Sequence, residues 1–486
     1  MWAINGYPQM KKTQRKLLAI CCQLTVFCLP VGLVACVTAP QTTVKKTTGD
    51  LQYQLPVGLA ANPQVQWGKN PEKAWWHAYG SREIDQEVAI ALKNNPGLEE
   101  QAWALRQQYE QYLSSRGSLL FPQVSASSSA NREKLFFGPG LLLGPFNLYN
   151  AGVNVSYGID LFGASRYALQ SALSRIDSQR YQYAAASQTL VANVITASFN
   201  RAYAQVQLQT TENLLHEQQD YLHLLQQQQQ AGAVSDDQVA DQQAVLLGTA
   251  AVLPGLKKAE VQALHQLNLL LGRSPDTPTE NLSLQALQIP QGIPVSVPSQ
   301  LLQQRPDLRA TEALWQAAAA DVGVAKANLY PQIRLTANYA STAVSPSQLF
   351  SAKSMVWGLG GGITAPIFDG GALRAEKRAA IDAFNAAGVS YRQTVLRAFQ
   401  DVADSLQALQ QDAEAEQLRL QALQAAQHSL QLSQARYQAG AEALTRVLLQ
   451  QQTVTTAEQS LVTAHAMHLA DSVALYQAIG GQWGSS

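Results

Sequence analysis

Apolar residues recur at alternating steps of four and three positions along a proline-free stretch from about 372 to 439. A mean period of 3.5 residues is typical of a helix packed along other helices in a coiled-coil-like seam. About 65 residues at 1.5 Å each predict a helix on the order of 100 Å long. Because so narrow a stripe cannot form a core alone, we expect similar helices elsewhere. The stripe consists of Val395, Phe399, Val402, Leu406, Leu409, Ala413, Leu420, Leu423 and Leu430.

The first half of the chain shows a fixed order of patterns. Short helices are predicted over about 81–94 and 98–119, and Phe121-Pro122 ends the second because proline restricts the residue before it. The period then changes to two near 123–131 and again over 152–162, on either side of a Gly/Pro-rich segment at 138–145. We expect a hairpin of two strands of about ten residues, the length of a transmembrane β-strand.

A long helix over about 165–230 and a further helix after Gly232 complete this half, and the second half repeats the order. Phe121-Pro122-Gln123-Val124 corresponds to Tyr330-Pro331-Gln332-Ile333 at an offset of 209 residues. Ala231-Gly232-Ala233 corresponds to Ala439-Gly440-Ala441 at 208. An internal duplication follows. The predicted divisions are a first repeat at 81–275 with a hairpin near 123–162, a Pro-rich linker at 276–304, and a second repeat at 305–486 with a hairpin near 332–368.

The N-terminus has the pattern of a targeting segment, which is set aside from the fold. Basic residues precede an apolar run, and Leu33-Val34-Ala35-Cys36 resembles a bacterial lipobox. We expect a signal peptide over 1–35, lipidation at Cys36 and an extended tether over 36–80. The alternatives are an ordinary secretory signal or a transmembrane anchor, with Cys36 incidental. The other three cysteines would leave with the signal peptide, so the mature chain would have no disulfide.

Composition excludes several classes of function. The 34 basic and 34 acidic residues give zero net charge, which argues against a nucleic-acid partner. Glycines at 358–362 lie in an alternating strand pattern and do not form a phosphate loop. His465 and His468 share a helical face but have no acidic neighbour in the sequence, so we expect surface histidines and no metal site. With no nucleophile–base arrangement, we expect neither an enzyme nor a cofactor.

Four candidate membrane strands cannot close a barrel, and an open sheet edge in lipid leaves backbone groups unsatisfied at several kcal/mol each. The chain must therefore form oligomers. Helices on the order of 100 Å attached to such strands would also extend far beyond a bilayer about 30 Å thick. A lipid-anchored barrel that continues into long helices is the architecture of a conduit.

Several motifs resemble the outer-membrane efflux factors of the TolC type, above all the lipidated OprM- and NodT-like branch. They are Ile293-Pro294, Leu301-Leu302, Arg305-Pro306-Asp307, Tyr330-Pro331, Phe368-Asp369-Gly370-Gly371, Tyr437-Gln438-Ala439-Gly440 and Leu475-Tyr476-Gln477-Ala478-Ile479-Gly480-Gly481. The resemblance covers nearly the whole mature chain in order. It implies a mixed α and transmembrane β fold: a homotrimer with a twelve-stranded outer-membrane barrel and a periplasmic α-helical tunnel.

The resemblance also implies partners and a location. A periplasmic adaptor and a proton-driven inner-membrane pump, of resistance-nodulation-division or major-facilitator type, would work with this chain. The protein would lie in the outer membrane, in contact with its lipid, as the exit duct for drugs or other small toxic compounds. Alternatives from other classes are a periplasmic adaptor lipoprotein, which would need a lipoyl-like β-domain, and a structural coiled-coil lipoprotein, which would need no hairpins.

In this family the tunnel closes just after the two glycines that correspond to Gly232 and Gly440. Tyr437 matches the family tyrosine that bonds to the neighbouring helix pair, and Gln238 occupies the position where relatives often have aspartate. Acidic positions of relatives fall at Arg446 or Leu449, so a ring of aspartates at these places is absent. Nearby charged candidates for a gate are Asp236, Asp237, Asp241, Glu442 and Arg446, each of which is equally well read as a solvated helix-end residue. Glu442 and Arg446 are four residues apart and are expected to form an exposed ion pair. Arg305 and Asp307 are expected to cap a helix and form a local ion pair.

The lipobox yields one testable expectation. Acyl chains on Cys36 would contribute about 0.8 kcal/mol per buried CH₂, but the barrel would insert without them. Cys36→Ala with a cleavable signal retained should therefore leave trimers in the outer membrane, measured by membrane fractionation and native gels. Loss of all trimer from that membrane would contradict this expectation.

Overall fold

The computed structural model describes residues 38–40, 64–69, 72–136, 142–295 and 304–480, and the structural statements below concern these residues. The predicted signal peptide and Cys36 lie outside them, as do most of the predicted tether and residues 137–141 between the first two strands. Within the described part, helices and strands follow one another in two similar series.

The first series comprises α2 (Arg82–Asn94), α3 (Pro96–Leu120), β2 (Gln123–Phe136), β3 (Leu142–Ile159), α4 (Ala164–Gln230) and α5 (Asp236–Leu270). The second comprises α7 (Pro306–Ala327), β5 (Gln332–Ala343), β6 (Met355–Thr364), α8 (Ala372–Gln438) and α9 (Leu444–Ile479). The long helices α4 and α8 both have 67 residues and begin 208 positions apart. The duplication read from the sequence therefore extends to the lengths of the elements.

Local sequence explains where the helices begin. The Ser81 side chain accepts a hydrogen bond from the backbone N–H of Ile84, and the Asn95 side chain accepts one from Leu98, so α2 and α3 have polar N-caps. The long helices begin differently, after Gly163 and Gly371, whose φ angles are 88° and 89°. A left-handed residue at the same place in both repeats turns the chain from strand to helix, and glycine adopts it without a steric penalty.

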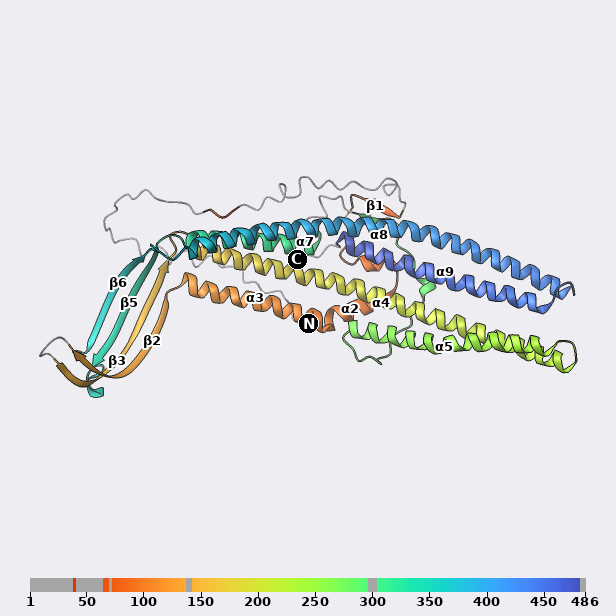
Figure 1. The fold of residues 1–486 in the computed structure, drawn as a ribbon, viewed down its shortest axis with the longest axis horizontal. Coiled ribbons are helices and arrows are strands. Elements are labelled where there is room, and N and C mark those ends of the chain that lie inside the picture. The colour runs from red at the N-terminus through yellow and green to blue at the C-terminus, as the bar shows by residue number, and fades with distance from the viewer. Residues whose placement is uncertain (1–37, 41–63, 70–71, 137–141, 296–303, 481–486) are drawn as a thin grey trace. The chain divides into compact units, whose positions relative to one another are not determined.

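The long helices lie side by side with the shorter ones (Figure 1). α4 contacts α2, α3, α5, α7 and α9, whereas α8 contacts chiefly α7 and α9. The predicted stripe of α8 is buried through Val395, Val402, Leu406 and Leu409. Leu420 is 44% exposed, contrary to the sequence prediction, and lines a cavity together with Glu416. Among the described helices, none is both long and apolar enough to cross a membrane.

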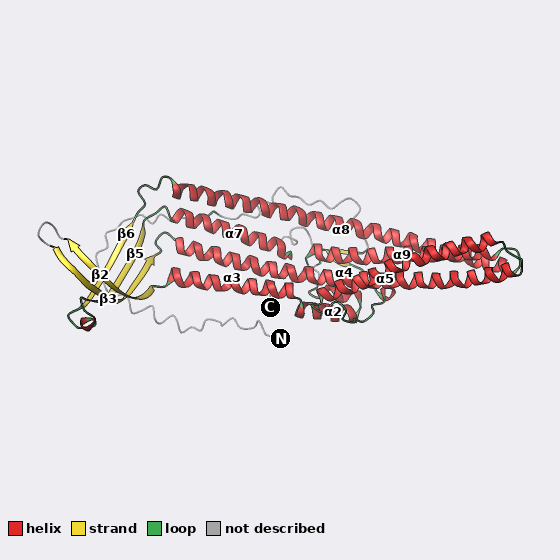
Figure 2. Cartoon of the chain, turned by 60° about the horizontal axis from the view of Figure 1, so that its bottom comes forward, coloured by secondary structure: helices red, strands yellow, loops and turns green. Residues whose placement is uncertain are grey.

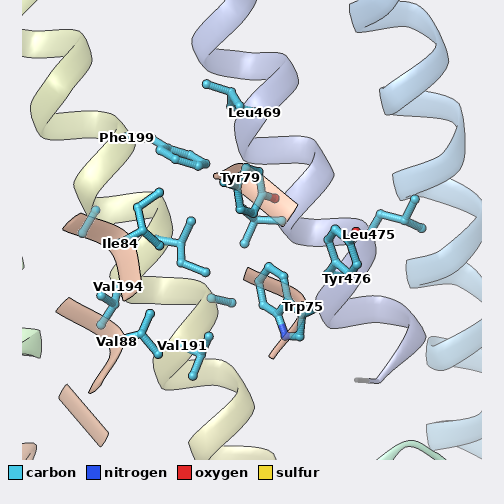
Figure 3. Packing of buried hydrophobic residues seen from close by; sticks show 14 of the residues in the cluster. Trp75, Tyr79, Ile84, Val88, Val191, Val194, Phe199, Leu469, Leu475 and Tyr476 are labelled. Carbon is cyan, nitrogen blue, oxygen red and sulfur yellow. The ribbon is translucent and has the colours of Figure 1, made fainter. Parts of the chain in front are cut away.

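The segments predicted as a tether and a linker contribute to the core. β1 (Val65–Trp67) pairs in parallel with β4 (Ile293–Val295), and the 3₁₀ helices η3 (Trp75–Tyr79) and η4 (Leu284–Ala286) pack nearby. The ring of Trp75 stacks on Tyr476 of α9 with centroids 4.7 Å apart. Figure 3 shows Trp75 and Tyr79 among side chains of α2, α4 and α9. The sequence interpretation of these segments as a tether and a linker did not include these elements, because elements of three to five residues are too short to show a period.

The four remaining strands form an antiparallel sheet in the order β2-β3-β5-β6, beyond the ends of α3, α4, α7 and α8 (Figure 2). The strands have 14, 18, 12 and 10 residues, so the first hairpin is longer than predicted. The segment 138–145 is not wholly a turn, since β3 already begins at Leu142. The glycines of 358–362 lie within β6, as the alternating pattern indicated.

The register separates two chemically distinct faces of this sheet. Since side chains alternate along each strand, Val153 of β3 shares a face with its partners Ala126, Tyr339 and, through Tyr339, Trp357. That face is mainly apolar: Val124, Ala126, Val153, Val155, Tyr157, Ile159, Ile333, Leu335, Ala337, Tyr339, Trp357, Leu359 and Ile363. Its polar members, Ser128, Arg132, Asn147 and Ser341, lie toward the ends of the strands that are farther from the helices. The opposite face is mainly polar or small: Ser125, Ser127, Ser129, Asn150, Gly152, Asn154, Ser156, Thr336, Asn338, Gly358, Gly360 and Gly362, with Phe146, Leu148 and Val356 as larger apolar exceptions.

The contact between α4 and α7 supplies a test of helix packing. A Cβ added to buried Gly323 would lie 2.6 Å from the ring of Tyr167, so this glycine permits the close approach of the two helices. Gly323→Ala should lower the free energy of unfolding by about 1–3 kcal/mol through overpacking, measured by thermal unfolding in detergent. Gly248→Ala, in open space on α5, should be neutral or stabilising by up to about 1 kcal/mol. Equal effects of the two substitutions would contradict this packing.

Candidate functional site

The two helical tips, where α4 joins α5 and α8 joins α9, have the same backbone turn. Backbone N–H groups of Ala231, Gly232 and Ala233 donate to the carbonyls of Gln227, Gln229 and Gln228. In the second tip, the N–H groups of Ala439, Gly440 and Ala441 donate in the same pattern to Ala435, Tyr437 and Arg436. Gly232 and Gly440 have φ angles of 75° and 69°, so each occupies the left-handed position that ends a helix. The two glycines singled out in the sequence therefore form the tips.

The first tip carries three of the candidate acidic residues. Asp236 accepts a hydrogen bond from Nε2 of Gln229 across the turn at 2.5 Å. A hydrogen bond from Ser235 lowers the pKa of exposed Asp237. Both aspartates lie in the first turn of α5, where the partial positive charge of a helix N-terminus favours them. Their place in the first turn explains them as helix-start residues, and both side chains are exposed and therefore accessible to another chain.

The second tip carries a different set of polar contacts. The Ser433 hydroxyl donates to Oε2 of Glu442 at 2.9 Å, and Nε of Arg446 lies 3.8 Å from Oε1 of the same carboxylate. The predicted pair between Glu442 and Arg446 is thus present, but the Arg446 side chain is 55% exposed. Such an exposed pair contributes on the order of 0.3–0.5 kcal/mol, so it supports the turn only weakly.

A cavity of about 250 Å³ lies close to these tips, lined by α4, α5 and α9. Gln238 and Asp241 of α5 line it opposite Thr445 and Leu449 of α9, so the two repeats meet here. Two further lining groups are the Tyr221 hydroxyl and Oε1 of Gln218, both buried without a hydrogen-bond partner in the described part. No pattern in the sequence pointed to these two residues, because their burial depends on which helices surround them.

Tyr437 lies one turn before Gly440 and is 41% exposed. Within the described residues of this single chain, its hydroxyl forms no hydrogen bond with Gln238. The expected contact between these residues is one between neighbouring helix pairs, and it stays a prediction.

Arg305 forms more contacts than the sequence predicted. Its guanidinium contacts Asp307 at 2.8 Å, as expected, and also Asp401 of α8 at 2.9 Å. Nη1 donates to the carbonyl of Ala478 near the end of α9. The Asp307 carboxylate accepts from the backbone N–H of Leu308 at the start of α7. The buried guanidinium of Arg305 therefore connects α7, α8 and α9, whereas the sequence predicted only a local ion pair with Asp307.

The reading of His465 and His468 as surface histidines was wrong. Their Nδ1 atoms each lie 2.7 Å from an oxygen of Glu416 on α8, and the His468 side chain is only 3% exposed. The signal was available in the sequence. Glu416 lies 24 residues before Gly440 and His465 lies 25 residues after it, so two antiparallel helices joined at that glycine bring them together. No cluster of three or more metal-ligating side chains with suitable geometry occurs among the described residues.

Comparison with known proteins identifies the family. Residues 88–273 and 297–481 match the family described as outer membrane efflux protein. The chain belongs to this family. It is 31% identical to the pyoverdine export outer membrane protein OpmQ of Pseudomonas putida, over 94% of this chain and 96% of that protein. It is 29% identical to the cation efflux system protein CusC of Escherichia coli, over 95% and 99% of the two chains.

Solved structures agree with this assignment. The outer-membrane channel OprN is 26% identical and matches with a TM-score of 0.83, over 92% of this chain and all of that one. As an outer membrane efflux protein, the chain is a transport protein of the outer membrane and not an enzyme. The adaptor and the coiled-coil lipoprotein considered from the sequence are therefore not supported.

Proposed function

We propose that this outer membrane efflux protein is the exit duct of a tripartite pump, formed by three copies of the chain. The observation that supports this most directly is the four-stranded sheet. Its edge strands β2 and β6 each have only one neighbour within the described chain. Open edges in lipid are costly, and pairing β6 of one copy with β2 of the next closes a barrel of twelve strands.

The two faces of the sheet indicate which side of the barrel wall contacts lipid and which side lines the lumen. A transmembrane barrel has an apolar outer surface and a polar interior. The face that includes Val153, Tyr339 and Leu359 would therefore contact lipid, and the face that includes Asn154 and Thr336 would line the lumen. The side chains of Asn154 and Ser127 are 3.4 Å apart on that polar face, so it carries hydrogen-bonding groups suited to a water-filled passage.

The helices would continue the passage into the periplasm as a tunnel. A periplasmic adaptor and a proton-driven inner-membrane pump would act at its far end, where Gly232 and Gly440 form the tips. Cargo would be drugs or other small toxic compounds. The names of relatives specify different cargoes, pyoverdine for OpmQ and cations for CusC, so the family alone does not fix the cargo of this chain.

A lipid on Cys36 is compatible with the start of the described chain. The carbonyl of Thr38 accepts from Nζ of Lys326 at 2.9 Å, and the N–H of Ala39 donates to the Tyr167 hydroxyl at 3.3 Å. Tyr167 is in the first turn of α4 and Lys326 in the last turn of α7, the ends of these helices that join the strands. An acyl chain carried two residues before Thr38 would add a second attachment to the outer membrane.

The direct test is electrical. Purified protein should behave as a trimer by native mass measurement and should give discrete single-channel conductance in planar bilayers. A stable monomer, or a trimer that never conducts even when its tips are disrupted, would contradict the proposed duct.

The assignment of the faces predicts opposite outcomes at two adjacent residues. Val153→Arg places a cation on the apolar face and should cost about 2–4 kcal/mol if it lies near the bilayer centre, which would reduce the amount of assembled trimer in the outer membrane. Asn154→Arg, on the polar face, should assemble nearly normally. Quantitative fractionation compares them, and a greater loss for Asn154→Arg would reverse the assignment.

The residues at the helical tips predict that a weak, uncharged contact holds the tunnel closed. A hydrogen bond between Tyr437 and Gln238 would contribute only about 0.5–1.5 kcal/mol, against about 1.5–3 kcal/mol for a bond to a charged group. Tyr437→Phe should therefore raise the resting conductance, while doubling the salt concentration should change the closed fraction little. Tyr109→Phe on α3 is the matched control.

The opposite salt response would reassign the gate. A closed state that opens steeply with salt would show that charges hold it. The gate would then consist of Asp236, Asp237, Asp241, Glu442 and Arg446, and Tyr437→Phe should behave like the control.

A further inference from the structure

The duplication extends to the pairing of the strands. In the first hairpin Gln123 pairs with Ser156, and in the second hairpin Gln332 pairs with Thr364. The first strands of the two hairpins are therefore offset by 209 residues and the second strands by 208. The motifs before and after the strands show the same two offsets in the sequence. Each strand residue of one repeat thus has a defined counterpart in the other repeat.

A junction between the two repeats is present within the chain. β3 of the first repeat pairs with β5 of the second, for example through Ser156 with Thr336, and α4 packs on α7. The counterparts of β3 and α4 are β6 and α8, which lie at one edge of the sheet and of the helical layer (Figure 2). The counterparts of β5 and α7 are β2 and α3, which lie at the other edge. One chain therefore carries both halves of a second junction of the same kind, at its opposite edges.

The two edges expose apolar side chains whose counterparts pair with each other. Ile367, just after β6, is 99% exposed, and Val124 of β2 is 67% exposed. Their counterparts, Ile159 and Ile333, lie opposite each other where β3 pairs with β5, and Ile159 is only 38% exposed. A second copy placed by the same junction would bring Ile367 opposite Val124 and remove apolar surface from water.

The backbone groups at the open edges match in the same register. The N–H of Thr342 donates to the carbonyl of Ser354, so even-numbered residues face β5 along β6 and odd-numbered residues turn their N–H and C=O groups to the open edge. At the corresponding positions of β2, the residues that face the open edge have even numbers. The junction register places Ile363 opposite Ser128, so two outward-facing residues meet, and a shift by one residue would separate them. Pro366 has an even number, so its missing N–H does not face the open edge.

The helices beside the strands permit the same close approach. Within the chain, Tyr167 of α4 lies against Gly323 of α7, where an added Cβ would be 2.6 Å from the ring. The counterparts at the two edges are Ala375 of α8 and Ser114 of α3, and both are exposed. Because alanine takes the place of the tyrosine, serine can take the place of the glycine without a clash.

We propose that β6 of one copy pairs with β2 of the next copy in the register in which β3 pairs with β5. Thr364 of one copy then lies opposite Ser127 of the next, and α8 packs on α3 of the next copy as α4 packs on α7. The proposal rests on the trimeric duct proposed above and specifies the contact between its subunits. A second copy of this chain is the partner because the two edges are counterparts of surfaces that already fit each other, and such a head-to-tail contact can close into a ring.

Disulfide crosslinking of the full-length protein in outer membranes tests the register. Thr364 and Ser127 would form a non-hydrogen-bonded pair with Cα atoms about 4.5 Å apart, within the range of about 4.4–6.8 Å that a disulfide spans. On oxidation, Thr364→Cys/Ser127→Cys should shift from the mobility of one chain to that of three on non-reducing denaturing gels. The matched control is Ser156→Cys/Thr336→Cys, at the corresponding pair within the chain. This control and each single variant should keep the mobility of one chain.

Cysteine pairs in shifted registers provide the contrary outcome. Thr364→Cys combined with Ser125→Cys or Ser129→Cys represents a shift by two residues and should crosslink much less than the combination with Ser127→Cys. Preferential crosslinking of a shifted pair would overturn the proposal. Should Thr364→Cys/Ser127→Cys fail to assemble, Gly362→Cys/Ser129→Cys tests the next pair of the same register with the same expectation, since a Cβ at Gly362 meets open space.

Native mass measurement of the same samples separates this proposal from the proposed duct. An intact trimer in which neither predicted pair crosslinks would overturn the register and leave the duct in place. Crosslinks at the predicted pairs that join more than three chains would support the register and contradict a closed trimer. A stable monomer would contradict both.

Discussion

The rest of this structure depends on the need of two 67-residue helices to bury narrow apolar stripes. Neither α4 nor α8 can form a core alone, so each packs against the shorter helix that follows it. α4 also packs against helices of both repeats, and α8 also packs against α7. Where backbones approach most closely, small residues make room: a Cβ at Gly323 would meet Tyr167, and one at Gly388 would lie 3.2 Å from Trp315. The segments before the first repeat and between the repeats then fill the space around α9 with Trp75, Tyr79 and the paired strands β1 and β4.

Much of this could be read from the sequence because long elements repeat their period many times. The stripe of α8, the glycines at the tips and the offset of 208 residues defined the helices to within a few residues. The short elements within the predicted tether (36–80) and linker (276–304) could not be predicted. β1 and β4 have only three residues each, and each is a strand only because it pairs with the other. The register of the strands can be assigned only when the paired strands are known. It was needed before the lipid-facing side of the sheet could be proposed.

Side-chain partners were harder to predict than elements, for a related reason. Glu416 is 49 residues from His465, and Arg305 is 96 from Asp401, so neither pair is visible in a local window. The hairpin of α8 and α9 nevertheless has a simple geometry, since equal rise per residue on both helices places positions at equal distances from Gly440 opposite each other. Reading His465 against this geometry would have shown an acidic partner. Gln64 is different, because its contact with His468 depends on a segment with no recognisable pattern.

The two repeats have the same order of elements but differ in the contacts within their helical hairpins. The positions that correspond to Glu416 and His465 at an offset of 208 are Leu208 and Lys257, so the first repeat has neither the carboxylate nor the histidine. Lys257 instead lies 3.5 Å from Glu212 in an exposed pair. α4 is also enclosed by five helices, whereas α8 rests chiefly on α7 and α9. Within the chain, the second hairpin therefore has fewer neighbouring helices than the first, and the contacts of Glu416 with His465 and His468 join its two helices at a place where the first hairpin has only an exposed pair.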